Sequence, residues 1–249
     1  MIVSPESQCF SVFGFSIYYY GVILAFAIFV GITLADKIAK KYYNQIFVYE
    51  QAFYLVIMGL LGARLYFCLL TNNCLNILNI RNGGLSIHGA IIAGVLTLYF
   101  FSKKYKFSFL KLCDIYAVSL PLAQSIGRWG NYINSEAFGK PTEYFLKLYI
   151  APYFRPLEYE NYKYFHPTFL YESILDLLLF FVLYKLIIKK HKNAGFISGI
   201  YLISYAVIRS LIEPLRLDCT SFLFNIPVPI IISVIMACVG VYLIKVSSK

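Results

Sequence analysis

The chain has 249 residues, of which 60% are hydrophobic and only 14% are charged. An ordinary soluble domain is roughly 45–50% apolar and about 25% charged, so this composition excludes a disordered chain and argues against a soluble globular domain. The formal net charge is +10, but the cations lie in short clusters between apolar runs. That pattern is typical of a multi-pass membrane protein and argues against nucleic-acid binding.

Seven apolar runs are candidates for membrane-spanning helices, each of which needs about 20 residues. We therefore predict an all-α polytopic membrane protein with one integral membrane domain over residues 1–249. In chain order the predicted spans are 17–35, 47–70, 85–101, 112–127, 168–188, 195 to about 213, and 224–244. The second, fourth and fifth of these carry charged residues or are short.

The positions of the lysines predict how these spans are oriented in the membrane. They gather after the first, third and fifth spans and at the C-terminus. Because basic residues favour the cytoplasmic side, the N-terminus is predicted outside and the C-terminus in the cytoplasm. The polar, Tyr-rich segment 128–168 then lies outside, where we expect a small loop subdomain.

The six cysteines form no CxxC pair, so no zinc site or redox motif is predicted. Cys9, Cys74 and Cys219 lie in predicted outer segments. An external disulfide among these three and a set of free thiols are both open from the sequence.

Polar and ionisable residues at membrane depth are costly, so each of them needs a reason. In the predicted topology they converge on the outer leaflet, whereas the inner ends of the spans carry only lysines. The residues concerned are Tyr20, Arg64, His88, Arg128, Asn131, Asn134, Glu136, Glu172, Tyr205, Arg209, Glu213 and Arg216. This bias indicates one polar site near the outer membrane surface.

The sixth span carries Tyr205, Arg209, Glu213 and Arg216 at helical spacing, which predicts that they share one helical face. Glu213 can pair with either arginine and leave the other guanidinium for a ligand anion. The alternative is an ion-pair seam that holds helices together, and the spacing does not choose between the two.

Three further segments carry polar side chains. Residues 127–139 place Arg128, two amides and Glu136 among three glycines, which suits a phosphate-binding loop or an ordinary Asn/Gly turn. His88 lies between glycines at a membrane boundary, where it is either structural or a proton acceptor. Residues 166–172 look mainly structural, with Glu172 placed to orient an arginine.

Two or more arginines facing an outer pocket favour a phosphate ligand, because guanidinium binds phosphate oxygens in a bidentate way. At that depth the available phosphates are lipid headgroups. The residues alone therefore predict a membrane protein that binds or processes a lipid phosphate.

Four motifs resemble those of the prolipoprotein diacylglyceryl transferase family. They are GGLSIHGAIIAG at 83–94, GRWGNYINSEAFG at 127–139, HPTFLYE at 166–172 and YAVIRSLIEPLR at 205–216, joined by Tyr-Tyr-Gly at 19–21. They stand in the family's order, and the resemblance covers nearly the whole chain. Pro214 departs from it, because an aromatic residue is more usual there, and a kink is expected at that position.

The resemblance implies transfer of the diacylglyceryl group of phosphatidylglycerol to the lipobox cysteine of prolipoproteins, with release of glycerol phosphate. It implies a bacterial inner-membrane enzyme with an outward-facing site and with no cofactor, metal or nucleic-acid partner. The implied catalytic residues are His88, Arg128 and Arg209. The implied substrate-binding residues are Tyr20, Arg128, Asn131, Asn134, Glu136, Gly139, Tyr205, Arg209 and Glu213.

Within that set, Arg128 and Arg209 are assigned to the phosphate, and Glu136 and Glu213 are expected to orient arginines. For His88, accepting the thiol proton and orienting a neighbour fit the sequence equally well. The roles of Arg64 and Arg216 stay open. Two rival functions are an anion transporter, which would need polar residues through the full membrane depth, and a non-catalytic lipid-docking scaffold, which would tolerate loss of His88.

Overall fold

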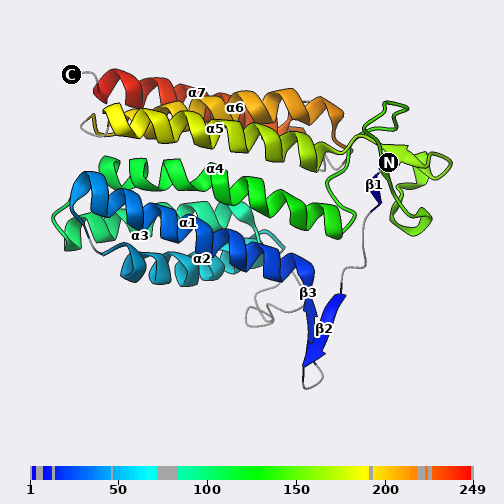
Figure 1. Cartoon of the computed structure of the whole chain (residues 1–249), viewed down its shortest axis with the longest axis horizontal. Coiled ribbons are helices and arrows are strands. Elements are labelled where there is room, and N and C mark those ends of the chain that lie inside the picture. The colour runs from blue at the N-terminus through cyan, green and yellow to red at the C-terminus, as the bar shows by residue number, and fades with distance from the viewer. Residues whose placement is uncertain are drawn as a thin grey trace. The chain divides into compact units, whose positions relative to one another are not determined.

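The computed structural model describes residues 2–3, 8–12, 15–45, 47–71, 84–190, 193–217, 222–223 and 226–247. Within these residues the chain forms seven α-helices, shown in Figure 1. They are α1 (Tyr19–Tyr43), α2 (Val48–Thr71), α3 (Ile87–Lys104), α4 (Phe109–Ile133), α5 (Thr168–Lys190), α6 (Phe196–Ile212) and α7 (Val228–Ser247). The chain divides into two compact units, Met1–Gly31 with Tyr116–Lys249 and Ile32–Ile115.

In the described part of the chain, five helical stretches are long and apolar enough to cross a membrane. They are α1, α2, α4, Phe196–Leu215 and α7. The other two helices are not among them: α3 has only 18 residues and ends in two lysines, and α5 contains the charged residues Glu172 and Asp176. The prediction of a multi-pass, mainly helical membrane protein is confirmed, and the exact seven-span topology stays a prediction.

The predicted helix ends differ from the observed ones in two informative places. The fourth helix continues to Ile133 instead of ending at Gly127, so Arg128 and Asn131 lie on its last turns and not in a loop. The first helix continues to Tyr43, with Lys40 and Lys41 in its last turn, where cations interact favourably with the helix dipole. The polar segment between α4 and α5 therefore begins after residue 133, later than predicted.

Pro214 marks a change of helix type. The α-helix α6 ends at Ile212, and the 3₁₀ helix η5 (Glu213–Leu215) continues the chain with Pro214 near its start. Proline has no N–H to donate to the preceding turn, so a regular α-helix does not continue through it. Glu213 and Arg216 therefore lie beyond the α-helix that carries Arg209.

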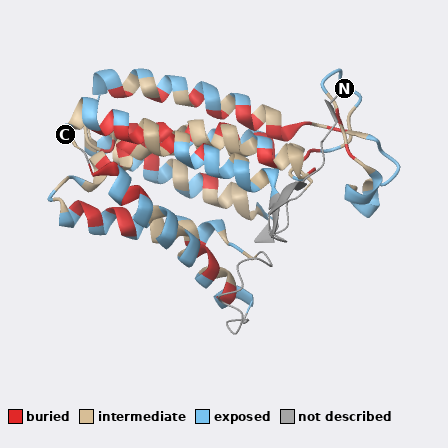
Figure 2. Cartoon of the chain, turned by 60° about the horizontal axis from the view of Figure 1, so that its bottom comes forward, coloured by how far each residue is buried: buried red, intermediate tan, exposed pale blue. Residues whose placement is uncertain are grey.

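In the larger unit, α5, α6 and α7 pack side by side (Figure 1). The hydroxyl of Ser173 on α5 donates to the carbonyl oxygen of Ser125 on α4 over 2.9 Å, which ties these two helices together. The helices expose many apolar residues, which Figure 2 shows as long pale-blue and tan stretches. On α7, Val234 and Ile235 are each more than half exposed, as expected of side chains that face lipid.

Short strands accompany the helices, so the all-α prediction is wrong in detail. Two hairpins form from β2 (Gln8–Val12) with β3 (Phe15–Tyr18) and from β6 (Phe222–Leu223) with β7 (Ile226–Pro227). A three-stranded sheet has the order β1 (Ile2–Val3), β4 (Leu148–Tyr149), β5 (Tyr164–Phe165), with β1 and β4 parallel. The segment between α4 and α5 also contains the 3₁₀ helices η3 (Pro152–Phe154) and η4 (Leu157–Tyr159).

That segment has its own hydrophobic cluster. Phe138, Leu148, Ile150 and Phe165 are buried against Phe169, which belongs to the first turn of α5. Leu148 and Ile150 alternate with the less buried Tyr149, as in a strand with one covered face. This cluster joins the segment between α4 and α5 to the helix that carries Glu172.

In the smaller unit, α2 packs against α3. Buried Arg64 donates from Nη1 to the carbonyl oxygen of Gly84 over 3.1 Å, just before α3 begins. At the other end of this pair, Lys104 lies 2.7 Å from Glu50, which also accepts a hydrogen bond from the Tyr105 hydroxyl. Burial and the bond to Glu50 raise the pKa of Tyr105.

Candidate arginine and carboxylate site

The larger unit contains a cluster of three arginines and three carboxylates, which we call the arginine cluster: Arg128, Glu172, Asp176, Arg209, Glu213 and Arg216. Five of these six residues were among the sequence candidates for one polar site, and Asp176 was not. Arg128 comes from the end of α4, Glu172 from the start of α5 and Arg209 from the end of α6. Alternate up-and-down helices bring these three ends together.

Glu172 is the centre of the cluster. Its Oε2 lies 2.5 Å from Nη2 of Arg128, and its Oε1 lies 2.7 Å from Nη1 of Arg216 and 3.4 Å from Nη1 of Arg209. The Glu172 side chain is 2% exposed. One buried carboxylate therefore contacts three guanidinium groups, which exceeds the single arginine expected for it from the sequence.

Glu213 selects one of its two possible partners. Its Oε2 accepts a hydrogen bond from Nη2 of Arg209 over 2.5 Å, whereas Arg216 contacts Glu172. The ion pairs that the spacing of the sixth span allowed are therefore present, and Arg209 contacts two carboxylates while its side chain stays 16% exposed. The anion site stays a prediction.

The arginines lie nearer the surface than the carboxylates. The Arg128 and Arg209 side chains are 19% and 16% exposed, against 2% for Glu172 and 4% for Glu213. Among the described residues, no acceptor contacts Nη1 of Arg128 or Nε of Arg209. These N–H groups are available to a ligand anion from the exposed side.

Asp176 is the member of the cluster to which the sequence analysis gave no role. It lies one helical turn beyond Glu172 on α5, is fully buried, and has its Oδ2 4.0 Å from Nε of Arg128. The four-residue spacing from Glu172 was the available signal, because residues at i and i+4 share a helical face.

The chain leaves α4 through a tight polar turn. The Glu136 carboxylate accepts hydrogen bonds from the amides of Asn131 over 3.0 Å and Asn134 over 3.5 Å. Ser135 and Ala137 have positive φ angles of 53° and 54°, a conformation that costs energy for residues other than glycine. Among the described residues Glu136 contacts these two amides, and its expected role in orienting an arginine stays a prediction.

The two candidate tyrosines lie on either side of α4. The ring of Tyr20 packs over Gly130, where an added Cβ would lie 2.7 Å from the ring. Tyr205 stacks on Tyr201 with ring centroids 5.8 Å apart, and the Tyr201 hydroxyl donates to Gln124 over 3.3 Å. Tyr20 interacts electrostatically with the charged groups of Glu136 and Arg128. Tyr205 interacts in the same way with Arg128 and Arg209.

Gly139 lies in a crowded position of the backbone. A Cβ there would lie 2.8 Å from Cβ of His166 and 2.8 Å from the carbonyl oxygen of Leu215. The Gly139 N–H donates to the carbonyl oxygen of His166 over 2.9 Å, and Gly139 also forms a β-bridge with Arg216. These contacts account for the glycine through packing, and its part in substrate binding stays a prediction.

Replacing Gly139 by alanine is therefore expected to destabilise the protein by about 1–3 kcal/mol, because the surrounding backbone must shift. Thermal unfolding in detergent measures this loss. The control is Gly127→Ala, because an added Cβ at Gly127 meets nothing within 4 Å and alanine favours the helix. Equal stability of the two variants would contradict the packing role of Gly139.

His88 and Arg64 belong to the smaller unit, so the predicted convergence of all candidates on one site stays a prediction. His88 is exposed on the first turn of α3, with its ring 6.0 Å from that of Tyr66. Cys113 and Cys238 are free thiols, and Cys68 is buried on α2. Cys74, Cys219 and the side chain of Cys9 lie outside the described residues, and so does the possible disulfide among them.

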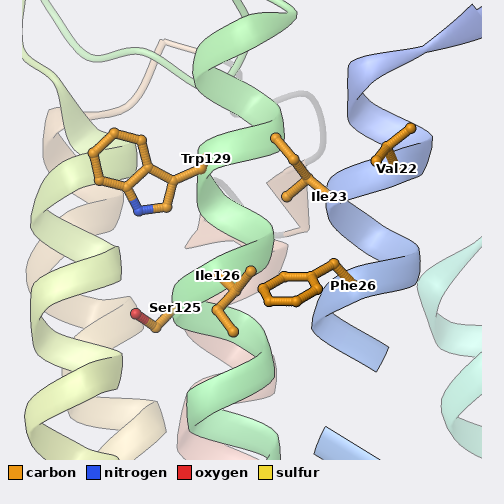
Figure 3. Close-up of a pocket in the computed structure, with 6 residues that line it drawn as sticks. All are labelled: Val22, Ile23, Phe26, Ser125, Ile126 and Trp129. Carbon is orange, nitrogen blue, oxygen red and sulfur yellow. The ribbon is translucent and has the colours of Figure 1, made fainter. Parts of the chain in front are cut away.

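An apolar cavity of about 350 Å³ lies between α1 and α4, next to the Arg128 turn. Val22, Ile23 and Phe26 of α1 line it together with Ser125, Ile126 and Trp129 of α4. Figure 3 shows Phe26 and Ile126 facing each other between the two helices. The cavity is open to the surface, and Phe26 is 56% exposed, so an apolar chain can enter it from the side.

Apolar spanning helices with a buried arginine and carboxylate cluster beside an apolar cavity define a multi-pass membrane protein with a polar site. The family model described as prolipoprotein diacylglyceryl transferase matches residues 7–246, and the chain belongs to this family. It is 38% identical over 238 residues to the phosphatidylglycerol–prolipoprotein diacylglyceryl transferase of Thermotoga maritima, covering 93% of this chain and 81% of the relative. The enzyme of the same name from Acaryochloris marina is 42% identical over 227 residues, covering 88% and 82%.

Proposed function

We propose that this chain transfers the diacylglyceryl group of phosphatidylglycerol to the lipobox cysteine of prolipoproteins, the first step of bacterial lipoprotein maturation. Family membership over nearly the whole chain supports this, and so do relatives that carry this name. The reaction forms a thioether: the cysteine sulfur bonds to the glyceryl carbon, the carbon–oxygen bond to the phosphate breaks, and glycerol phosphate leaves with the bonding electrons. The thiol proton passes to a base.

The observation that carries the proposal is the arrangement of Arg128 and Arg209. Both side chains are partly exposed, whereas Glu172 and Glu213, the carboxylates that they contact, are almost fully buried. The leaving phosphate gains negative charge as the carbon–oxygen bond breaks. Preorganised cations stabilise that charge without reorganising during the reaction. We therefore assign both guanidinium groups to the lipid phosphate.

The remaining candidates surround this position. Asn131, Asn134 and Glu136 form a hydrogen-bonded group at the end of α4, and Tyr20 and Tyr205 flank that helix. Hydroxyl and amide groups there suit the glycerol headgroup. The cavity lined by Phe26 and Ile126 is proposed to take an acyl chain, because it is apolar and lies one turn from Arg128.

His88 is proposed as the acceptor of the thiol proton. A cysteine thiol has a pKa near 8.5, so near neutral pH it needs a base to become the nucleophile. Neutral imidazole is suited to that task. The proposal extends to a seven-span topology with the N-terminus outside, in the inner membrane, with the site open to the outer leaflet and no cofactor required.

The test is transfer by purified protein in detergent, using phosphatidylglycerol and a lipobox peptide. Peptide mass is expected to rise by one diacylglyceryl group on the cysteine. A peptide with serine in place of that cysteine is the control and is expected to gain nothing. A well-folded protein that binds phosphatidylglycerol but leaves the peptide mass unchanged would favour a lipid-docking scaffold instead.

A further inference from the structure

The carboxyl group of Asp176 differs from the other two carboxylates of the arginine cluster. Glu172 contacts three guanidinium groups, and Glu213 accepts a hydrogen bond from Arg209. Within the described residues, neither oxygen of Asp176 has a hydrogen-bond partner, although the residue is fully buried. The nearest cation, Nε of Arg128, is 4.0 Å away, beyond hydrogen-bond distance.

Charged and titratable groups face Asp176 from each helix packed around it. Arg128 faces it from α4, and Glu172 lies one turn away on α5 itself. Tyr201, Tyr205 and Arg209 face it from α6. Tyrosine and arginine keep their usual charge states near neutral pH, and Glu172 is held by three cations. Asp176 is therefore the member of this group whose charge is free to change.

The charge of the whole cluster depends on that one group. Three guanidinium groups balance three ionised carboxylates, so the cluster is neutral when Asp176 is ionised and has one net positive charge when Asp176 is protonated. A phosphodiester brings one negative charge. Adding it to a neutral buried cluster would leave an uncompensated negative charge there, which is strongly unfavourable.

We propose that Asp176 carries a proton while the arginine cluster holds the phosphate of its lipid, so that lipid binding and protonation of Asp176 are linked. This inference rests on the proposed function. The direction follows from the charges: as pH rises and Asp176 loses its proton, the cluster loses its net positive charge and affinity for the lipid falls. Linkage to one proton limits the change to about tenfold in Kd per pH unit.

The test measures binding of phosphatidylglycerol to the full chain in neutral detergent, without peptide, from about pH 6 to about pH 9. In the wild type, Kd is expected to rise with pH by up to about tenfold per unit over part of this range. Asp176→Asn has the size of the protonated acid and no charge to lose. Its Kd is expected to match the lowest wild-type value and to stay flat.

The matched control is Glu158→Gln, the same type of change at an exposed carboxylate in η4, which is expected to follow the wild-type pH profile. An Asp176→Asn protein that retains the wild-type slope, or that binds more weakly at every pH, would overturn the inference. A well-folded wild type that binds no phosphatidylglycerol at any pH would overturn both this inference and the proposed function.

A second measurement uses the wild type alone and does not depend on how well a variant folds. Phosphatidylglycerol is added in weak buffer with a pH indicator, on the alkaline side of the transition. Uptake of up to one proton per bound lipid is expected, and diacylglycerol, which has no phosphate, is expected to cause none. Lipid binding without proton uptake would overturn the linkage while leaving the transferase proposal intact.

Discussion

Replacing Arg128 or Arg209 by alanine is expected to lower diacylglyceryl transfer by at least about 10²–10³-fold, the usual cost of removing one preorganised group that stabilises developing negative charge. Each change removes a guanidinium from the exposed side of the cluster and leaves Glu172 with one fewer cation. Initial rates of thioether formation, measured by peptide mass at saturating peptide, give the size of the loss.

Arg155→Ala is the control for removing an arginine from the same unit. Arg155 lies in the segment between α4 and α5 and donates to the backbone carbonyls of Ile150 and Glu160, outside the arginine cluster. Its loss is expected to leave the transfer rate within a few-fold of the wild type. Full activity of a folded Arg128→Ala protein would remove Arg128 from the phosphate site.

Lysine at either position separates charge from shape. Arg128→Lys keeps the cation but cannot present two parallel N–H groups, and it has no second branch to contact Glu172 and a phosphate together. Its rate is therefore expected to lie between those of the wild type and the alanine variant.

Glu172→Gln is expected to have the second large effect, on stability as well as on activity. The change keeps the size of the side chain but removes the charge that Arg128, Arg209 and Arg216 share. Breaking a buried ion pair typically costs about 3–5 kcal/mol, because the remaining charges stay buried. Thermal unfolding in detergent is expected to shift to lower temperature, and the transfer rate is expected to fall at least as far as in either arginine variant.

The exposed carboxylate Glu158, changed to glutamine, is again the control and is expected to leave both measurements unchanged. An unfolding temperature of Glu172→Gln equal to that of the wild type would contradict the central position of Glu172. Because three arginines share this one carboxylate, the effects of changing Glu172 and an arginine together are expected to be smaller than their sum.

The sequence alone was enough to predict the class of protein and most of its helices. Composition argues against a soluble domain. Apolar runs bounded by lysines predict helices, and most observed helix ends lie within a few residues of the predicted ones. These features are local, because burying about 20 apolar residues in lipid requires a helix whatever its neighbours are. The ordered motifs led to the family that the comparisons show.

Only the tertiary structure decided how the polar residues are paired. Glu172 could have contacted one arginine or none. Its three arginine partners lie 37 to 44 residues away along the chain, and all of them lie outside α5. Gly139 lies in the polar motif 127–139, and only the structure shows that its backbone is packed against His166 and Leu215. Arg128 was expected in a loop and lies on a helix whose Gly130 receives the ring of Tyr20. Such choices depend on which helix ends pack together, and a local pattern of residues does not contain that information.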